Sequence, residues 1–287
     1  MKKNNILEVI HNDTDLLVLN KPAGVLSIKD RYNADLENLH TEAQKKYGKL
    51  WVVHRIDRET SGLICFAKNE NAHKFLSKKF EDRSIHKIYL ALVDGALKEQ
   101  EGEIDLPIAE NLQKRGTYKV DYREGKTALS FYEVVEQFRH FSLLAVQIFT
   151  GRTHQIRVHC KAIGHPLAID ELYGKRKGFL LSEVKKKYKV GKWEDESPVM
   201  SRLSLHAYNL ILEQPTTHQT LYLTAPLPND FEVLLKQLRK YDALPTACTS
   251  SFDTTSWPML LYSFILYLPV AILLKLILIT ASVTGFG

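Results

Sequence analysis

Cysteine is scarce in this chain, and no two cysteines stand close together. The 287 residues include three, Cys65, Cys160 and Cys248, and no CxxC pair occurs. A disulfide framework and a cysteine zinc site both depend on several cysteines at suitable spacings. The pattern therefore argues against both, and it favours a reducing compartment. The N-terminus, MKKNNILEVIHND, turns polar too early for a secretory signal, so we expect a cytoplasmic protein.

Several widespread catalytic motifs are also missing. No glycine-rich phosphate loop of the Walker type occurs, and Ser61 lies in TSG rather than in the GxSxG of a serine hydrolase. His154 and His159 are five residues apart, whereas a zinc-binding helix places its histidines at i and i+4. We therefore expect a site that needs no metal ion and no other cofactor.

The overall composition is that of an ordinary globular protein with a basic bias. Hydrophobic residues make up 45% of the chain and charged residues 25%, which is enough for a sizeable core. The formal net charge is +6 and the isoelectric point about 9.0. A basic protein of this kind favours a polyanionic partner.

Strands outnumber helices in the predicted elements. Apolar runs bounded by turn residues predict strands, and apolar spacing at i, i+3 and i+4 predicts helices. Few strands alternate with helices in βαβ order, so the sequence predicts an α+β fold. The predicted strands include 6–10, 16–19, 85–95, 102–110, 127–138, 140–149, 202–213 and 219–226, and the predicted helices are 33–47, 71–80, 229–241 and a segment after Gly151.

The stretch WVVHRIDRETSGLICFAK, residues 51–68, places charged side chains on a tight link between two apolar strands. Asp57 lies there between Arg55 and Arg58. Neighbouring positive charges favour an ionised carboxylate, which can act as a nucleophile or stabilise positive charge developing on a carbon. The alternative is a structural Asp–Arg pair that caps the turn.

A second stretch, TGRTHQIRVHCKAIGHP, concentrates basic side chains within residues 150–166. It contains Arg152, His154, Arg157 and His159. Together with Asp57, these residues suggest a cofactor-free site built from a carboxylate and arginines. Such a site suits chemistry at the glycosidic bonds of an anionic polymer. The histidines are interpreted as structural hydrogen-bond partners or contacts to that polymer rather than as acid–base groups.

Two further segments are set apart by composition. The lysine-rich insertion 174–198 is either a solvated surface arm or an RNA contact, whose phosphate binding would not depend on sequence. The stretch 258–283 is apolar enough and long enough to span a bilayer, although Lys275 lies within it. We predict a catalytic domain at 1–242 and a tail at 243–287, which is either a membrane anchor or a non-native C-terminus.

The blocks LLVLNKPAGVLS, VHRIDRETSGLICFAK, HKIYLALVDG, TGRTHQIRVH and RLSLHA follow one another in this order. In this order they resemble the RluA-type pseudouridine synthases, which modify ribosomal RNA and tRNA. The resemblance covers about 6–241, without a preceding RNA-binding domain of the S4 type. It implies a mixed, largely antiparallel bent sheet flanked by helices and loops, with the catalytic cleft across the sheet. We expect such a protein to act as a monomer.

The resemblance also implies roles for individual residues. Asp57 matches the catalytic aspartate, which acts at the ribose C1′ of an extruded uridine. Arg152 matches the basic residue that pairs with the aspartate, and Arg55 the arginine that fills the gap in the RNA stack. Tyr89 matches the tyrosine that packs on the target base and can serve in proton removal from C5, and Leu205 matches the apolar residue that lines the base pocket.

The sequence alone leaves alternatives to these roles open. Tyr89 alternates within a predicted strand and could belong to the core. A catalytically silent RNA-binding protein could use the same scaffold, but it would not need the carboxylate of Asp57 in a cleft that faces phosphates.

Overall fold

The computed structural model describes residues 6–30, 33, 35–186, 188 and 195–244. The chain divides into a unit Met1–Ala243 and a second unit Leu244–Gly287. The predicted hydrophobic tail, including its span 258–283, lies outside the described residues. Within the described ranges, no helix is both long and apolar enough to cross a membrane.

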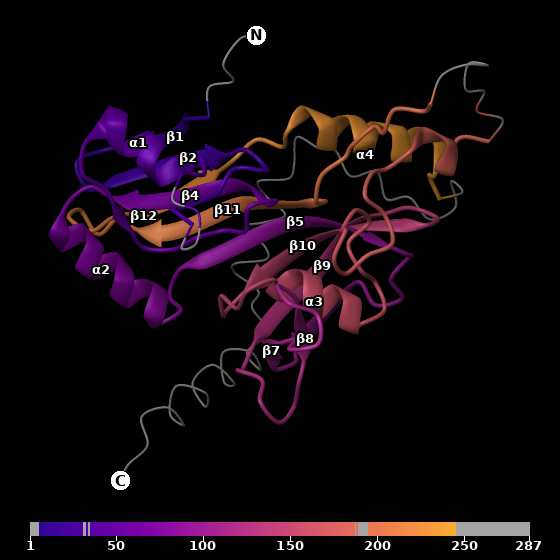
Figure 1. The fold of residues 1–287 in the computed structure, drawn as a ribbon, viewed down its shortest axis with the longest axis horizontal. Coiled ribbons are helices and arrows are strands. Elements are labelled where there is room, and N and C mark those ends of the chain that lie inside the picture. Colours follow the sequence, from indigo (N-terminus) through magenta and orange to yellow (C-terminus); the bar gives the residue numbers. More distant parts are fainter. Residues whose placement is uncertain (1–5, 31–32, 34, 187, 189–194, 245–287) are drawn as a thin grey trace. The chain divides into compact units, whose positions relative to one another are not determined.

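A ten-stranded mixed sheet forms the centre of the fold (Figure 1). Its strands run in the order β1-β2-β4-β11-β5-β10-β9-β6, with β12 paired to β11 and β3 to β4. Every pairing is antiparallel except the short parallel contact between β4 and β11. The strands are β1 Glu8–Asn12, β2 Leu16–Lys21, β3 Trp51–Val52, β4 Ser61–Ala67, β5 His86–Asp94, β6 Glu101–Asp105, β9 Leu129–Gln137, β10 Phe141–Ile148, β11 Leu205–Glu213 and β12 Thr220–Thr224. The predicted α+β class with a largely antiparallel sheet is confirmed.

The N-terminal half of the sheet is covered by a helix on each face. Successive side chains of a strand point to opposite faces, so a strand that is buried on both sides reads as a continuous apolar run. In β2, Leu17 and Leu19 pack with α1 (Leu39–Tyr47), whereas Leu16 and Val18 pack with α2 (Glu70–Glu81). The pattern repeats along β4, which explains why both strands lack polar residues at alternate positions.

The largest core cluster lies on β5, β10 and β11 beneath α3 (Gln155–Ala162). Ile156 and Cys160 of α3 pack there against strand residues that include Val146 and Leu205. A fourth helix, α4 (Asn229–Tyr241), buries an apolar stripe and is joined to β9 by a bidentate ion pair between Arg239 and Glu136. The residues that shape the candidate site thus belong to the main core.

Two predicted elements have different bounds in the structure. The first helix begins at Leu39 rather than near residue 33, because the Asn38 side chain caps it by accepting a hydrogen bond from Thr41 N. The predicted strand 102–110 is divided at Pro107, which has no N–H to donate to a ladder. Its first part is β6, and its second part, β7 (Ile108–Glu110), pairs in a separate small sheet with β8 (Tyr118–Val120).

Part of the lysine-rich insertion is attached to the fold. Among its described residues, Arg176 forms ion pairs with Asp94 and Glu183, and Phe179 is fully buried. The Phe179 ring packs edge-on against Phe141 of β10 at 5.3 Å. The first half of the insertion is therefore not a free solvated arm. The run of residues 189–194 lies outside the described part.

Candidate functional site

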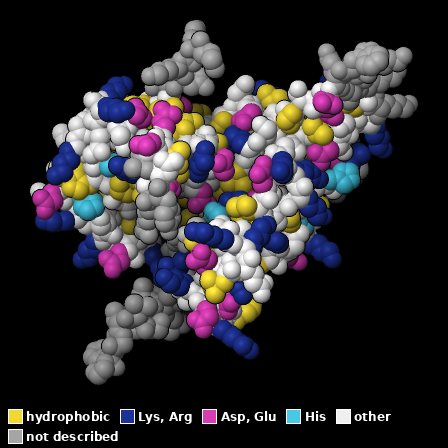
Figure 2. All heavy atoms as spheres, in the orientation of Figure 1, with side chains coloured by type: hydrophobic (Ala, Val, Ile, Leu, Met, Phe, Trp, Pro, Cys, Tyr) yellow, Lys and Arg dark blue, Asp and Glu magenta, His cyan; other side chains and the backbone are white. Residues whose placement is uncertain are grey.

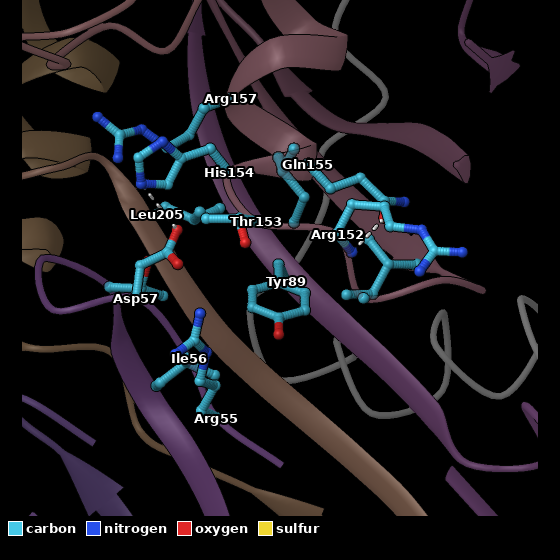
Figure 3. A pocket seen from close by; sticks show the side chains of 14 residues that line it. Arg55, Ile56, Asp57, Tyr89, Arg152, Thr153, His154, Gln155, Arg157 and Leu205 are labelled. Atoms are coloured by element: carbon cyan, nitrogen blue, oxygen red, sulfur yellow. Dashed lines mark hydrogen bonds and ion pairs between the residues drawn. The ribbon is translucent and has the colours of Figure 1, made fainter. Parts of the chain in front are cut away.

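The predicted site residues meet in one cavity (Figure 3). Its wall combines the link between β3 and β4, the middle of β5, the end of β10, the start of α3 and the start of β11. The lining residues are Arg55, Ile56, Asp57, Thr60, Tyr89, Ile148, Gly151, Arg152, Thr153, His154, Gln155, Ile156, Arg157 and Leu205. This set includes all five residues to which the resemblance assigns a role, namely Arg55, Asp57, Tyr89, Arg152 and Leu205.

The loop that carries Asp57 is fixed by its backbone and by its buried neighbour. Ile56 is 7% exposed, and its carbonyl accepts a hydrogen bond of 2.6 Å from Ser27 Oγ. The carbonyl of Asp57 accepts from Thr60 N at 3.1 Å, which closes the turn. The Asp57 side chain keeps 30% of its surface exposed. A rigid backbone thus presents a carboxylate to an open cavity.

A buried lysine joins this loop to the NKPAG segment. Lys21 is fully buried, and its Nζ donates to the carbonyls of Pro22, Val25 and Arg58 at 2.9, 2.7 and 2.9 Å. These bonds use all the donors of an ammonium group. Burial lowers the pKa of Lys21 to about 7. Lys21 therefore shapes the loop that leads to Asp57.

The two arginines that flank Asp57 in the sequence lie in different places. Arg55 is exposed and lines the cavity. Arg58 instead donates from Nε to the Gly24 carbonyl at 2.9 Å and lies 3.6 Å from a carboxylate oxygen of Glu59. The sequence interpretation that both arginines act on Asp57 is therefore not supported for Arg58.

A different arginine brings buried positive charge to the carboxylate. Arg157 of α3 is 4% exposed and forms two hydrogen bonds of 2.7 Å with Asp170. Burial opposes its charge, but the hydrogen bonds and the charge of Asp170, with a smaller contribution from Asp57, raise the pKa of Arg157. Arg157 is therefore a permanently charged neighbour of Asp57.

The predicted pairing of Arg152 with Asp57 is not formed. Arg152 Nε donates to the Thr127 carbonyl at 3.0 Å. In the view of Figure 3 its guanidinium lies on the far side of Tyr89 from Asp57. Arg152 stands before the first turn of α3 and Arg157 inside the helix, so their side chains leave the backbone in different directions. The two arginines of GRTHQIR thus have different surroundings.

Tyr89 and Leu205 lie on neighbouring strands at the floor of the cavity. Tyr89 of β5 is paired with Ala207 of β11, and Leu205 is paired with Ala91. Tyr89 is 8% exposed and Leu205 3%, and both also belong to the main core cluster. Burial, followed by the charge of Asp57, raises the pKa of Tyr89, so its hydroxyl stays protonated at neutral pH.

His154 is the nearest described basic group to the carboxylate. Its Nε2 lies 4.0 Å from Asp57 Oδ2, and its Nδ1 lies 2.8 Å from the hydroxyl of Tyr173. It precedes α3 with a left-handed backbone, φ 57°. Burial, partly offset by the charge of Asp57, lowers the pKa of His154. The sequence analysis interpreted this histidine as a structural or RNA-contacting residue.

The RLSLHA block holds two parts of the site together. Ser61, at the start of β4, lies with its Oγ 2.9 Å from His206 Nδ1. Arg202 donates to the same Oγ at 3.2 Å and forms a bidentate pair with Asp230 at 2.7 and 2.8 Å. These contacts connect the end of the Asp57 loop to β11 and α4. Nothing in the spacing of the sequence predicted them.

No described group of three or more His, Cys, Asp or Glu side chains is placed to hold a metal ion. The side chains that line the cavity are one carboxylate, one phenol, one imidazole, three guanidinium groups, two threonine hydroxyls, one glutamine amide and several apolar groups. Figure 2 shows Lys and Arg side chains spread over one face of the molecule, among them a group near its centre. Such surroundings suit a polyanionic substrate.

Comparison with known proteins gives consistent matches. The family model described as RNA pseudouridylate synthase matches residues 15–162. The dual-specificity RNA pseudouridine synthase RluA of Vibrio vulnificus is 32% identical over 252 residues, covering 83% of this chain and 94% of its own length. The ribosomal large subunit pseudouridine synthase D of Zymomonas mobilis is 35% identical, covering 81% and 73%.

A solved structure shares the fold. The human RNA pseudouridylate synthase domain containing 4 superposes with a TM-score of 0.61 and 25% sequence identity, covering 81% of this chain and 93% of its own. This match covers a larger share of the chain than the family model does.

Proposed function

This chain belongs to the RNA pseudouridylate synthase family and is an isomerase that converts uridine to pseudouridine in RNA, and on that premise we propose how it acts and on what. We propose that it modifies specific uridines of ribosomal RNA or tRNA. The name of the Zymomonas mobilis relative, a ribosomal large subunit enzyme, supports ribosomal RNA, and the Vibrio vulnificus relative is called a dual-specificity RNA enzyme. The alternative of tRNA follows from the resemblance to the RluA-type synthases.

The observation that carries the proposal is the open cavity with Asp57 at its wall and a buried floor. A uracil stacked in RNA hides its glycosidic bond, so the nucleotide has to leave the stack to react. The ring of Tyr89 and the side chain of Leu205 offer a surface for the extruded base. Stacking on an aromatic ring contributes about 1–3 kcal/mol per base. Arg55 is exposed beside the cavity, where its planar guanidinium can fill the space left in the RNA.

In the proposed reaction, the Asp57 carboxylate acts at ribose C1′ while the C1′–N1 bond breaks. The bonding electrons leave with N1 of the uracil. The uracil turns within the cavity, and a new bond forms between C5 and C1′. The proton is lost from C5 and N1 gains one, so the product is an isomer of the substrate. Arg157 supplies fixed positive charge near the carboxylate.

Two roles differ from those expected from sequence. Because the Tyr89 hydroxyl stays protonated, we assign Tyr89 to packing on the base rather than to proton removal from C5. Arg152 donates to the Thr127 carbonyl and lies away from Asp57, so we assign it to the RNA backbone near the cavity.

The test uses the purified protein with ribosomal RNA and tRNA transcripts, and RNA from cells with and without the gene. We expect the protein to form pseudouridine at one or a few positions of a transcript. The same positions should carry pseudouridine in RNA from cells with the gene and uridine in RNA from cells without it. Binding of both RNA classes with no pseudouridine formed in either would indicate an RNA-binding protein without catalysis and would overturn the proposal.

A further inference from the structure

The imidazole of His154 is held by aromatic groups on the side away from Asp57. Its ring meets those of Tyr118 and Tyr173 edge to face, at 5.6 and 5.5 Å between centroids and 79° and 83° between planes. Only 14% of the His154 side chain is exposed. The ring therefore has one defined orientation, with Nδ1 directed to the Tyr173 hydroxyl and Nε2 to the cavity.

The hydrogen bonds around Tyr173 favour one tautomer of His154. The Tyr118 amide N–H donates to the Tyr173 hydroxyl oxygen at 2.7 Å. The hydroxyl hydrogen then has His154 Nδ1, 2.8 Å away, as its acceptor, an arrangement that uses both the donor and an acceptor site of the hydroxyl. A neutral imidazole that accepts at Nδ1 carries its proton at Nε2. The N–H of His154 therefore faces Asp57 Oδ2, 4.0 Å away.

The backbone of His154 also points to a role beyond capping a helix. A residue at the N-cap of a helix usually accepts an amide hydrogen bond with its side chain, but His154 makes no such bond. Its left-handed φ of 57° is uncommon for a residue other than glycine. Strained residues of this kind gather at functional sites when the surrounding structure holds them. Here the ring faces the carboxylate, with Nε2 4.0 Å from Asp57 Oδ2, and does not cap the helix.

We propose that His154 is a positioning residue for Asp57, with its tautomer set by the Tyr118 amide and the Tyr173 hydroxyl. When a nucleotide enters the cavity, the 4.0 Å separation closes to a hydrogen bond from Nε2–H to Oδ2. That bond holds one carboxylate oxygen and leaves Oδ1 directed at the ribose carbon. The inference rests on the proposed action of Asp57 at C1′.

The first test compares single-turnover rate constants of His154→Phe, His154→Gln and wild type on an RNA that wild type modifies. Phenylalanine keeps the ring packing and removes both nitrogens, so the rate constant should fall about 10–100-fold, the scale of a misplaced reacting group. Glutamine offers an amide N–H near the position of Nε2 and should recover most of the loss. The dissociation constant for RNA should change little in either variant.

His218 provides a matched control for backbone strain. It has a left-handed φ of 58°, like His154, but its side chain is 64% exposed and pairs with Glu213 away from the cavity. His218→Phe should therefore lower stability by an amount similar to His154→Phe and leave the rate constant unchanged. Equal rate losses in both variants would show that strain alone is responsible and would overturn the inference.

The second test reads the tautomer directly in the folded wild-type protein. With ¹⁵N-labelled histidine, one of the 11 imidazoles should be lost in His154→Gln and so be assigned to His154. Its nitrogen shifts at neutral pH should report Nε2–H, and in Tyr173→Phe they should move toward a mixture of tautomers. A wild-type signal from Nδ1–H would overturn the inference.

These outcomes separate the two proposals. If wild type forms no pseudouridine in any RNA tested, the proposed function fails while the tautomer measurement still stands. If wild type is active and His154→Phe is equally active, only the role of His154 fails.

Discussion

At the scale of the residue, the partly buried His54 makes the stability of the fold depend on pH in the acid range. The Nε2 of His54 accepts a hydrogen bond of 2.9 Å from Cys65 N, and its ring stacks on Phe80 at 4.8 Å. An acceptor nitrogen cannot take up a proton without losing that bond. Burial, together with the nearby charge of Lys87, lowers the pKa of His54 to about 3.

The direction in which stability changes with pH follows from proton uptake by His54 in the folded and in the unfolded chain. Below its ordinary pKa of 6.5, His54 takes up a proton in the unfolded chain, but in the folded chain only near pH 3. The unfolded state therefore binds more protons in this window, and the free energy of unfolding falls as the pH drops from 6.5 toward 3. In His54→Gln this fall should be shallower, by at most about 1.4 kcal/mol per pH unit.

Denaturant titrations of both proteins between pH 4 and 7 measure this difference. Other buried histidines, such as His206, contribute equally to both proteins and cancel. Parallel curves for wild type and His54→Gln would show that His54 titrates alike in the folded and unfolded chains.

The residues at the site could be predicted unequally from the sequence. Asp57 was found because charge between two apolar strands conflicts with simple burial, and its cavity placement agrees. The predicted pairing of Arg152 with Asp57 was wrong, because the direction of each arginine side chain depends on where α3 begins. His154 was missed for a similar reason, since its partner Tyr173 is distant in sequence and brought near only by the fold.

At the scale of the element, the parallel contact of β4 with β11 requires a glycine. Gly62 is paired with Ala207 and has a φ of 111°. A Cβ added there would lie 2.2 Å from the Ala207 carbonyl oxygen, which is backbone and cannot rotate away. The strand that follows the Asp57 loop, β4, and the strand that begins with Leu205, β11, could then no longer approach each other.

Gly62→Ala should therefore lower the free energy of unfolding by about 3 kcal/mol or more, since strain and overpacking each cost about 1–3 kcal/mol. Gly48→Ala is the control, because Gly48 also has a positive φ, 78°, but no neighbour within 4 Å of an added Cβ. It should cost only the backbone strain. Equal losses in the two variants, measured by denaturant unfolding, would contradict the role of the strand contact.

Element types were more predictable than element ends. The apolar runs and the amphipathic spacing indicated most strands and helices, because burial on one or both faces dictates these patterns. The start of α1 depended on one capping side chain, and the break between β6 and β7 on one proline. The small β7–β8 sheet was missed as a pair because β8 has only three residues, too few to show an alternating pattern.

At the scale of the whole molecule, the residues at the predicted domain boundary, Asp242 and Ala243, still contact the rest of the described fold. The Asp242 carboxylate accepts hydrogen bonds from the amide and the ring of His140, at 2.9 and 2.6 Å, and its carbonyl accepts from Arg139 N at 2.9 Å. A bridge joins Phe138 to Ala243. These contacts fix the end of α4 to the turn between β9 and β10.

A chain cut after Leu244 should therefore be soluble and isomerise RNA at the rate of the full chain. A cut after Leu238 removes the Asp242 contacts and the ion pair of Arg239 with Glu136, so it should be clearly less stable. Thermal unfolding and single-turnover assays compare the three proteins. If the protein cut after Leu244 is insoluble or inactive, the enzyme needs the residues that follow, contrary to this prediction.

The central claim is that the carboxylate of Asp57 performs the bond exchange. Glu59→Gln is the matched control, because Glu59 lies two residues away in the same loop with a half-exposed side chain. The measurement is the single-turnover rate of pseudouridine formation by wild type, Asp57→Asn and Glu59→Gln, with RNA affinity measured in parallel. We predict that Asp57→Asn loses at least about 10³-fold in rate and keeps its affinity, while Glu59→Gln stays near wild type. Turnover by Asp57→Asn at a rate close to wild type would contradict the account.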